Sequence, residues 1–258
     1  MSRRTAGTLW AAFCVVALAL GGCAGGKASP KSKPIVHDKS YSLQLAQSQF
    51  NAGRVSEALA TLDEAIERSP DDAGLYHVYG TYCLRGGRHA QAIAAFGRAL
   101  ALDPHLTDAR NSLGVVYLMQ QRYPEAEAEL LRALEDPAYP TPQEPYLNLG
   151  LLYAEQGRDQ EALEALRRSV GIDPKYFKAH FHLASILDRV GNLLESAREY
   201  EVAEPGFRND GEYWWRRGFA YYRLGHAEKA RDSLLRVRAV APGSESAARA
   251  DEILAVLD

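Results

Sequence analysis

The sequence predicts an all-α solenoid of stacked helical hairpins, and three observations support this fold class. Gly80, Gly114, Gly150 and Gly218 each open a similar pattern of about 34 residues. Small residues recur 12 and 19 residues after each glycine, with Val237 as the exception, and a bulky residue stands between them. Proline closes several copies. A period between roughly 20 and 50 residues is typical of stacked repeats, which share one continuous core.

Alignment on this pattern divides the chain into six units, at about 39–72, 73–106, 107–140, 143–176, 177–210 and 211–244. Each unit has three small positions, where the two helices of a hairpin are expected to approach closely. Seventeen of these eighteen residues are Gly, Ala or Ser. They read Ala46-Ala58-Ala65, Gly80-Ala92-Ala99, Gly114-Ala126-Ala133, Gly150-Ala162-Ser169, Ala184-Ser196-Ala203 and Gly218-Ala230-Val237.

Glycine is predicted to separate the paired helices, because a left-handed turn strains glycine least. In the third unit, Tyr123-Pro124 is expected to take over this role. The turn glycines of the other units are Gly53, Gly87, Gly157, Gly191 and Gly225.

The segment 135–142 carries two extra residues and three prolines between the third and fourth units. It predicts either a bend that divides the solenoid into two groups of three units or a surface loop, and we favour the loop. Residues 244–257 read as a final amphipathic helix, because Ala250, Ile253, Leu254 and Leu257 follow helical spacing. Such a helix is suited to cap the stack.

Composition and motifs argue against catalysis and against nucleic-acid binding. The formal charge is −3, and no basic stripe runs along the repeats. The chain has no Gly-rich phosphate loop, no His-Glu-x-x-His and no Cys-x-x-Cys. We therefore expect no enzyme activity, no metal, no cofactor and no small-molecule substrate. Cys83 falls on an inward helix face, where a lone cysteine acts as a small hydrophobe.

The N-terminus is predicted to be an export signal. Arg3 and Arg4 precede an apolar stretch at about 9–20, and Gly21-Gly22-Cys23 follows it. This arrangement is typical of a secretory signal peptide at 1–22. The apolar core is shorter than the roughly 20 residues that span a bilayer.

The ending Leu20-Gly21-Gly22-Cys23 resembles the bacterial lipobox, although Gly21 is a less common residue in that motif. The resemblance implies that Cys23 carries a covalent lipid and becomes the mature N-terminus; the alternative is a plain signal peptide. Ala24 stands where an aspartate would imply retention at the inner membrane, so the resemblance favours a lipid anchor in the outer membrane, on its periplasmic face.

Residues 23–38 are predicted to form a flexible tether behind the acylated cysteine. Gly, Ser, Pro and Lys predominate in the first part of this segment, and it holds little to bury. Its lysines either touch anionic head groups or are simply solvated, and we favour solvation. The repeat domain is expected to occupy 39–258.

The repeat pattern resembles the tetratricopeptide repeat, a helix–turn–helix of 34 residues. The resemblance implies a right-handed superhelix in which the first helix of each unit lines a concave, partner-binding groove. Carried over position by position, the groove residues are Leu43, Phe50, His77, Leu84, Val115, Leu118, Leu147, Leu151, Phe181, Trp215, Phe219 and Tyr222. This groove is largely apolar, which suits an amphipathic helix or an extended hydrophobic segment.

Trp215, Phe219 and Tyr222 are the densest part of this predicted groove. Their i, i+4, i+7 spacing places them on one helix face. Large aromatic residues with arginine nearby are typical of binding hot spots. The alternative is that the tail helix covers them and makes them part of the core.

The whole layout, with lipobox, tether and six repeats, resembles the pilotin lipoproteins of type IV pilus systems. That resemblance implies a scaffold that helps an outer-membrane secretin subunit reach the membrane and assemble into its multimer. An alternative is another lipid-anchored adaptor, for example one for peptidoglycan hydrolases. An enzyme with a solenoid regulatory part is a more distant alternative, because the repeats leave no room for a catalytic domain.

Overall fold

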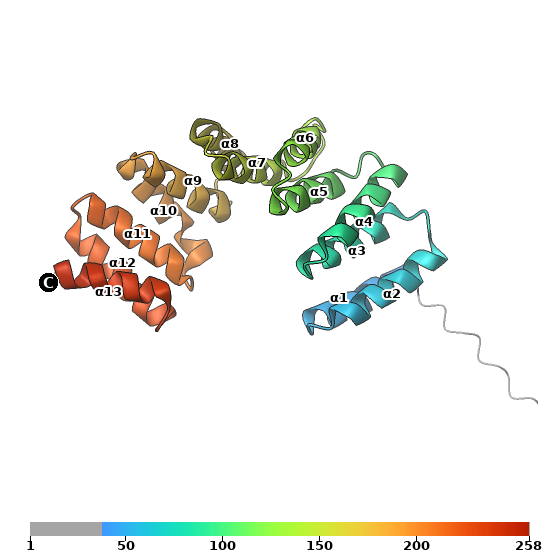
Figure 1. The fold of residues 1–258 in the computed structure, drawn as a ribbon, viewed down its shortest axis with the longest axis horizontal. Coiled ribbons are helices and arrows are strands. Elements are labelled where there is room, and N and C mark those ends of the chain that lie inside the picture. Colours follow the sequence, from blue (N-terminus) through green and yellow to red (C-terminus); the bar gives the residue numbers. More distant parts are fainter. Residues whose placement is uncertain (1–37, 258) are drawn as a thin grey trace, which may run out of the picture. The chain divides into compact units, whose positions relative to one another are not determined.

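The computed structural model describes residues 38–257, which form thirteen helices and no strand (Figure 1). The predicted signal peptide, Cys23 and nearly all of the predicted tether lie outside these residues. None of the helices described is long and apolar enough to span a membrane. The helices are α1 (Lys39–Asn51), α2 (Val55–Arg68), α3 (Ala73–Arg85), α4 (His89–Leu102), α5 (Thr107–Met119), α6 (Tyr123–Leu134), α7 (Gln143–Glu155), α8 (Asp159–Ile172), α9 (Phe177–Arg189), α10 (Leu193–Phe207), α11 (Gly211–Arg223), α12 (Ala227–Val240) and α13 (Glu245–Leu257).

The first twelve helices pair as six consecutive hairpins, followed by α13, which confirms the predicted fold class. Each even-numbered helix packs against the odd-numbered helices before and after it. Consecutive odd-numbered helices from α3 to α11 also contact one another. The odd-numbered helices therefore form a layer of their own, and we call its solvent-facing side the odd-helix face.

The small positions lie where the hairpin helices meet, and all eighteen are buried. A side chain at the glycine positions would collide with the facing helix: a Cβ on Gly150 would lie 2.6 Å from Leu166 Cγ. The serines at these positions satisfy their hydroxyls locally. Ser196 Oγ donates to the Ala184 carbonyl at 2.8 Å, and Ser169 Oγ donates to the Gln143 carbonyl at 2.7 Å. The close helix contact therefore leaves neither serine hydroxyl without a hydrogen-bond partner.

Each turn within a hairpin contains a residue in the left-handed conformation, as predicted. In the third hairpin, however, the prediction of which residues form the turn is wrong. Gly53, Gly87, Gly157, Gly191 and Gly225 have φ between 71° and 85°. In the third hairpin the left-handed residue is Gln121, with φ of 57°, and not Tyr123-Pro124. Tyr123 begins α6, and Pro124 lies in its first turn. Proline suits that place because its missing N–H would have no helical partner there.

The insertion after α6 folds back onto the start of α5. Thr107 Oγ1 donates to Asp136 at 2.7 Å, and the Tyr139 hydroxyl donates to Asp108 at 3.0 Å. Tyr139 is only 6% exposed, so the insertion contributes an aromatic side chain to the interior. A single hydrophobic cluster joins α6 to α7 and α8 across the insertion, with Leu130 and Leu149 among its members. The core is therefore continuous at this point.

Helix α13 covers the end of the stack. Ala250 and Leu254 are buried in a cluster that extends back to α9, and Ile253 and Leu257 pack against it. Ser244 caps the helix, because its hydroxyl accepts a hydrogen bond from the Ala247 amide at 3.1 Å. The predicted amphipathic spacing therefore corresponds to the buried side of α13.

Gly80→Ala tests the requirement for close helix contact. A Cβ there would lie 2.7 Å from Cε1 of the fully buried Phe96, so we expect the free energy of unfolding to fall by about 1–3 kcal/mol. Gly97→Ala in the same hairpin is the control, because nothing lies within 4 Å of its Cβ position. It should raise stability by about 0.5–1 kcal/mol through helix propensity. Urea unfolding followed by circular dichroism measures both, and equal effects would contradict the packing explanation.

Candidate protein-binding face

In the first two hairpins, the predicted groove residues are partly buried. Leu43, Phe50 and Leu84 pack against the N-terminal hydrophobic cluster while part of each side chain stays accessible. The Phe50 ring stacks on Tyr82 at 4.4 Å, and the Arg85 guanidinium lies 4.5 Å from the Phe50 ring centroid. Phe50 is therefore a fixed aromatic surface at this end of the odd-helix face.

The middle of the predicted groove is partly buried, and one of its residues belongs to the core. Leu147 is 5% exposed and belongs to the core, whereas Leu118 and Leu151 are partly buried against neighbouring clusters. His77 lies 5.8 Å from the Phe96 ring, and burial lowers the pKa of its imidazole. Val115 is partly exposed.

A polar chain crosses from α5 to α7, and the sequence pattern did not reveal it. Asn148 Nδ2 donates to Asn111 Oδ1 at 2.9 Å, and Asn111 Nδ2 donates to Glu144 at 3.4 Å. Asn111 is 7% exposed. These asparagines join neighbouring hairpins to each other, so their amide groups are already engaged. The only signal in the sequence was the presence of two asparagines at similar places in adjacent units.

On α11, Trp215, Phe219 and Tyr222 form a row of stacked rings, which we call the aromatic ladder. The Trp215 and Phe219 ring centroids are 5.3 Å apart with planes 8° from parallel. Phe219 and Tyr222 follow at 6.4 Å and 25°. Tyr222 is 36% exposed, and Phe219 and Trp215 are partly exposed. Phe181 lies apart from the ladder, because its ring stacks on Phe207 at 4.7 Å within the C-terminal core.

Helix α13 covers only one end of the aromatic ladder. Trp215 packs against the C-terminal cluster, and the Arg249 guanidinium of α13 lies 3.9 Å from its ring centroid. Phe219 and Tyr222 are not among the residues packed against a hydrophobic cluster. Each sequence-based alternative thus describes part of the ladder, since Trp215 packs against the core, Phe219 is partly exposed and Tyr222 is exposed.

Two arginines share one carboxylate beside Trp215. Glu212 accepts from Arg249 at 2.7 Å, and its other oxygen lies 2.9 Å from Arg216 Nε. Ser246 Oγ also donates to Glu212 at 2.7 Å. Burial alone would raise the pKa of Glu212, but the Ser246 hydrogen bond and the two arginine charges bring it below its ordinary value. Glu212 is therefore ionised. The trio of Glu212, Arg216 and Arg249 then carries a net positive charge.

The charge of Arg216 also acts on groups of α9 and α10. The Tyr200 hydroxyl of α10 lies 3.1 Å from Ser185 Oγ of α9, and burial raises the pKa of Tyr200 although the positive charge of Arg216 acts in the opposite direction. His182 on α9 is largely buried, and its pKa falls to about 4 because of burial and of the positive charges of Arg216 and Lys178. At neutral pH the imidazole is therefore uncharged, and positive charge surrounds it.

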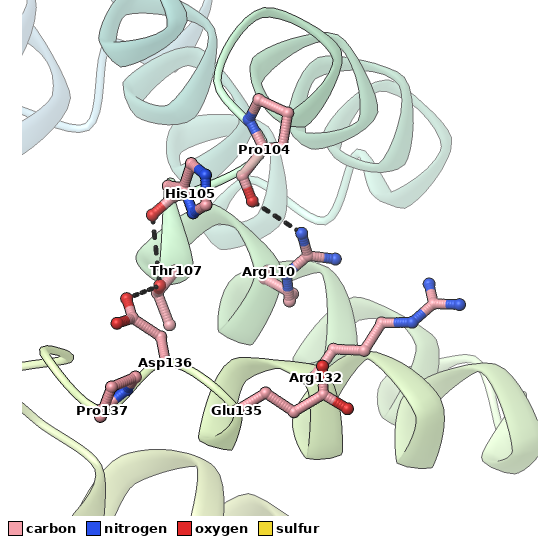
Figure 2. A pocket seen from close by; sticks show the side chains of 8 residues that line it. All are labelled: Pro104, His105, Thr107, Arg110, Arg132, Glu135, Asp136 and Pro137. Atoms are coloured by element: carbon pink, nitrogen blue, oxygen red, sulfur yellow. Dashed lines mark hydrogen bonds between the residues drawn. The ribbon is translucent and has the colours of Figure 1, made fainter.

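A hollow lies beside the insertion, with Arg110, Glu135 and Asp136 among the residues that line it (Figure 2). Its volume is about 640 Å³. Its polar groups are engaged with one another: Arg110 donates to the Pro104 carbonyl at 2.8 Å and to Glu129 at 3.1 Å, while Asp136 accepts from Thr107. These bonds hold the insertion against α5. No group of three or more His, Cys, Asp or Glu side chains within 38–257 is placed to hold a metal ion.

Family models match most of the repeats. Residues 42–170 match the middle TPR-like domain of cilia and flagella-associated protein 70, and residues 212–244 match a tetratricopeptide repeat. The first match spans half of the chain, and the protein therefore belongs to this family of TPR-like domains. Proteins built from such repeats generally act as scaffolds that bind other proteins on an extended surface.

Curated relatives are distant. The type IV pilus assembly protein PilF of Pseudomonas aeruginosa is 24% identical over 198 residues, which cover 74% of this chain and 77% of PilF. The TPR repeat-containing protein YpiA of Bacillus subtilis is 24% identical over 196 residues, but these cover only 44% of YpiA. The chain thus spans less than half of one relative and about three quarters of the other.

Two solved structures share the fold over nearly their whole length. The structure of Pseudomonas aeruginosa PilF has a TM-score of 0.73 at 21% identity, covering 84% of this chain and 96% of PilF. The structure of PilW, described as a widely conserved type IV pilus biogenesis factor, also has a TM-score of 0.73, at 23% identity, covering 84% of this chain and 100% of PilW. The chain is thus a repeat scaffold related at low identity to type IV pilus biogenesis factors.

Tyr222→Ser and Trp214→Ala distinguish the exposed end of the ladder from the core behind it. Tyr222 is 36% exposed, so its loss should change the free energy of unfolding by about 0.5 kcal/mol or less. Trp214 is 1% exposed and donates to the Arg208 carbonyl, so Trp214→Ala should cost about 3–5 kcal/mol. Urea unfolding measures both. A large loss for Tyr222→Ser would show that Tyr222 is structural.

The depressed pKa of His182 predicts a pH effect of definite sign. The folded pKa of about 4 lies below the ordinary value of 6.5, so the unfolded chain binds the proton first as pH falls. The His182 contribution to stability should therefore decline from pH 6.5 towards pH 4 and stay constant above this window. His182→Gln should remove this part of the pH dependence of unfolding. An NMR titration that gave His182 an ordinary pKa would contradict the expected environment.

Proposed function

We propose that this protein is a lipid-anchored scaffold of the outer membrane that assists the localisation and multimer assembly of a type IV pilus secretin. The observation that carries the proposal is the length match with PilF and PilW: the fold of this chain covers 96% and 100% of those two structures. PilF is a type IV pilus assembly protein, and PilW is a type IV pilus biogenesis factor.

The anchor in this proposal is Cys23, which the lipobox-like ending places at the mature N-terminus. One acyl chain binds a membrane only marginally, whereas two or more anchor a protein stably. An acylated Cys23 followed by a short tether would hold the repeat domain close to the membrane, on the periplasmic face. Secretin subunits must pass through this compartment, so the scaffold would meet them before they assemble.

The capture surface in this proposal is the odd-helix face, and the aromatic ladder is its strongest part. Phe219 and Tyr222 offer rigid apolar area that costs little side-chain entropy to use. Phe50 offers a second fixed ring near the other end of the described chain. We propose that a secretin segment lies along these rings.

A strain that lacks this gene tests the proposal. Membrane fractions resolved without full heat denaturation should show secretin monomers in place of the multimer. The intact gene should restore the multimer, and Cys23→Ala should leave the protein unable to reach the outer membrane and restore it less well. Tyr222→Ser together with Phe219→Ser should also fail to restore the multimer, although the protein stays folded and anchored.

Normal secretin multimers in the deletion strain would refute the assembly role. Cleavage of the signal with no lipid on Cys23, seen by mass spectrometry of the mature N-terminus, would refute the anchor alone. Gln91→Ser on the exposed side of α4 is the matched control for the two serine variants, because Gln91 lies on an even-numbered helix. It should restore the multimer fully.

A further inference from the structure

The buried end of the aromatic ladder combines apolar surface with positive charge, and this combination restricts what can bind there. Arg249 lies over the Trp215 ring at 3.9 Å, and Arg216 is the next residue along α11. Both guanidinium groups converge on the single carboxylate of Glu212. Two positive charges against one negative charge leave the trio with an excess of one positive charge.

The remaining charged groups around the trio do not cancel this excess. Glu245 lies 3.9 Å from Arg249, but its side chain is 88% exposed, so water screens the pair. Lys178 adds a positive charge on α9, and the carboxylate it influences, Glu144 on α7, has a pKa raised by burial and by Asp108. His182 is uncharged at neutral pH.

The Trp215 indole supplies an unused donor at the same place. Its Nε1 atom is buried and has no hydrogen-bond acceptor among the residues described. The neighbouring tryptophan of this helix, Trp214, is buried and donates to the Arg208 carbonyl at 2.9 Å. A buried donor without a partner costs about 1–3 kcal/mol, so an incoming acceptor would gain from meeting it.

We propose that this end of the ladder is a recognition site for an acidic side chain, so that the preferred partner segment presents an aspartate or glutamate next to apolar residues. The apolar side chains would lie on Phe219 and Tyr222. The carboxylate would lie against Arg216 and Arg249. Charge-assisted hydrogen bonds to guanidinium groups are roughly twice as strong as neutral ones, so the carboxylate would set the register of the segment. This inference specifies the partner chemistry of the face used in the proposed function, and rests on it.

A side-chain carboxylate suits this site better than a chain terminus. The asparagines of α5 and α7 are not free to hold a chain terminus, because the Asn148 amide donates to Asn111 and the Asn111 amide donates to Glu144. The donors that remain at the ladder are the two arginines and the indole N–H. A carboxylate on a side chain would reach this small group of donors while the backbone of the segment passes over the rings.

Fluorescence anisotropy with two labelled, acetylated and amidated peptides tests the inference. Both peptides alternate phenylalanine and serine, and they differ only in a central glutamate or glutamine. Residues 38–258 with an ordinary N-terminus should bind the glutamate peptide about tenfold more tightly, as expected for one charge-assisted contact. Raising the salt concentration should reduce this preference, because screening weakens the ionic contact.

Arg216→Gln should bring the affinity for the glutamate peptide down to that for the glutamine peptide, and Arg216→Lys should keep part of the preference. Phe219→Ser should weaken both peptides equally, since it removes apolar contact only. Arg167→Gln is the matched control, because this arginine is 51% exposed on α8 and pairs with Glu195, away from α11. Circular dichroism and the urea midpoint establish that each variant is folded.

Equal affinities for the two peptides would overturn the inference, as would no binding of either peptide up to about 1 mM. A preference that survives in both Arg216→Gln and Arg249→Gln would place the recognition elsewhere. Tighter binding of the glutamine peptide with a free C-terminus than of the amidated glutamate peptide would assign the site to a chain terminus. None of these results bears on secretin assembly in the deletion strain, so the inference and the proposed function fail separately.

Discussion

The close approach of the two helices within each hairpin is the contact on which the rest of this structure depends. Gly, Ala and Ser stand at the crossing points, and the facing bulky residues, such as Phe96 and Leu166, fill the space that a Cβ would need. Because the crossing points are repeated, every hairpin presents an equivalent surface to the next. Hydrophobic clusters therefore follow one another from α1 to α13, and one of them joins α6 to α7 and α8 across the insertion.

This packing also decides which side chains remain for binding. Residues that join successive hairpins are engaged in contacts within the stack, as with Leu147, which is 5% exposed, and with the hydrogen-bonded pair Asn111 and Asn148. Side chains remain exposed where no further helix covers them. Near the start of α13, Arg249 lies over Trp215, whereas Phe219 stays partly exposed and Tyr222 exposed. The position of the cap thus decides how far the rings of α11 are covered.

Electrostatics adds direction to this apolar face. The rings of the aromatic ladder by themselves favour capture of apolar side chains without strong selectivity. The convergence of Arg216 and Arg249 on Glu212 places a local positive charge at one end of the stacked rings. In a site of mixed character, apolar contact supplies most of the affinity and charge fixes the register. The unused indole donor of Trp215 belongs to the same corner.

The sequence by itself determined the all-helical class, the six hairpins, the buried small positions and the terminal helix, because a 34-residue period repeats one local packing solution. It did not determine the turn at Gln121, because the turns were predicted from glycine positions and a glutamine with positive φ does not match that pattern. It also left open which ladder residues are covered, and it placed Leu147 with the groove although this side chain is 5% exposed. Only the tertiary structure decided these points, because the exposure of a helix face depends on contacts with other units, which position within a repeat does not encode.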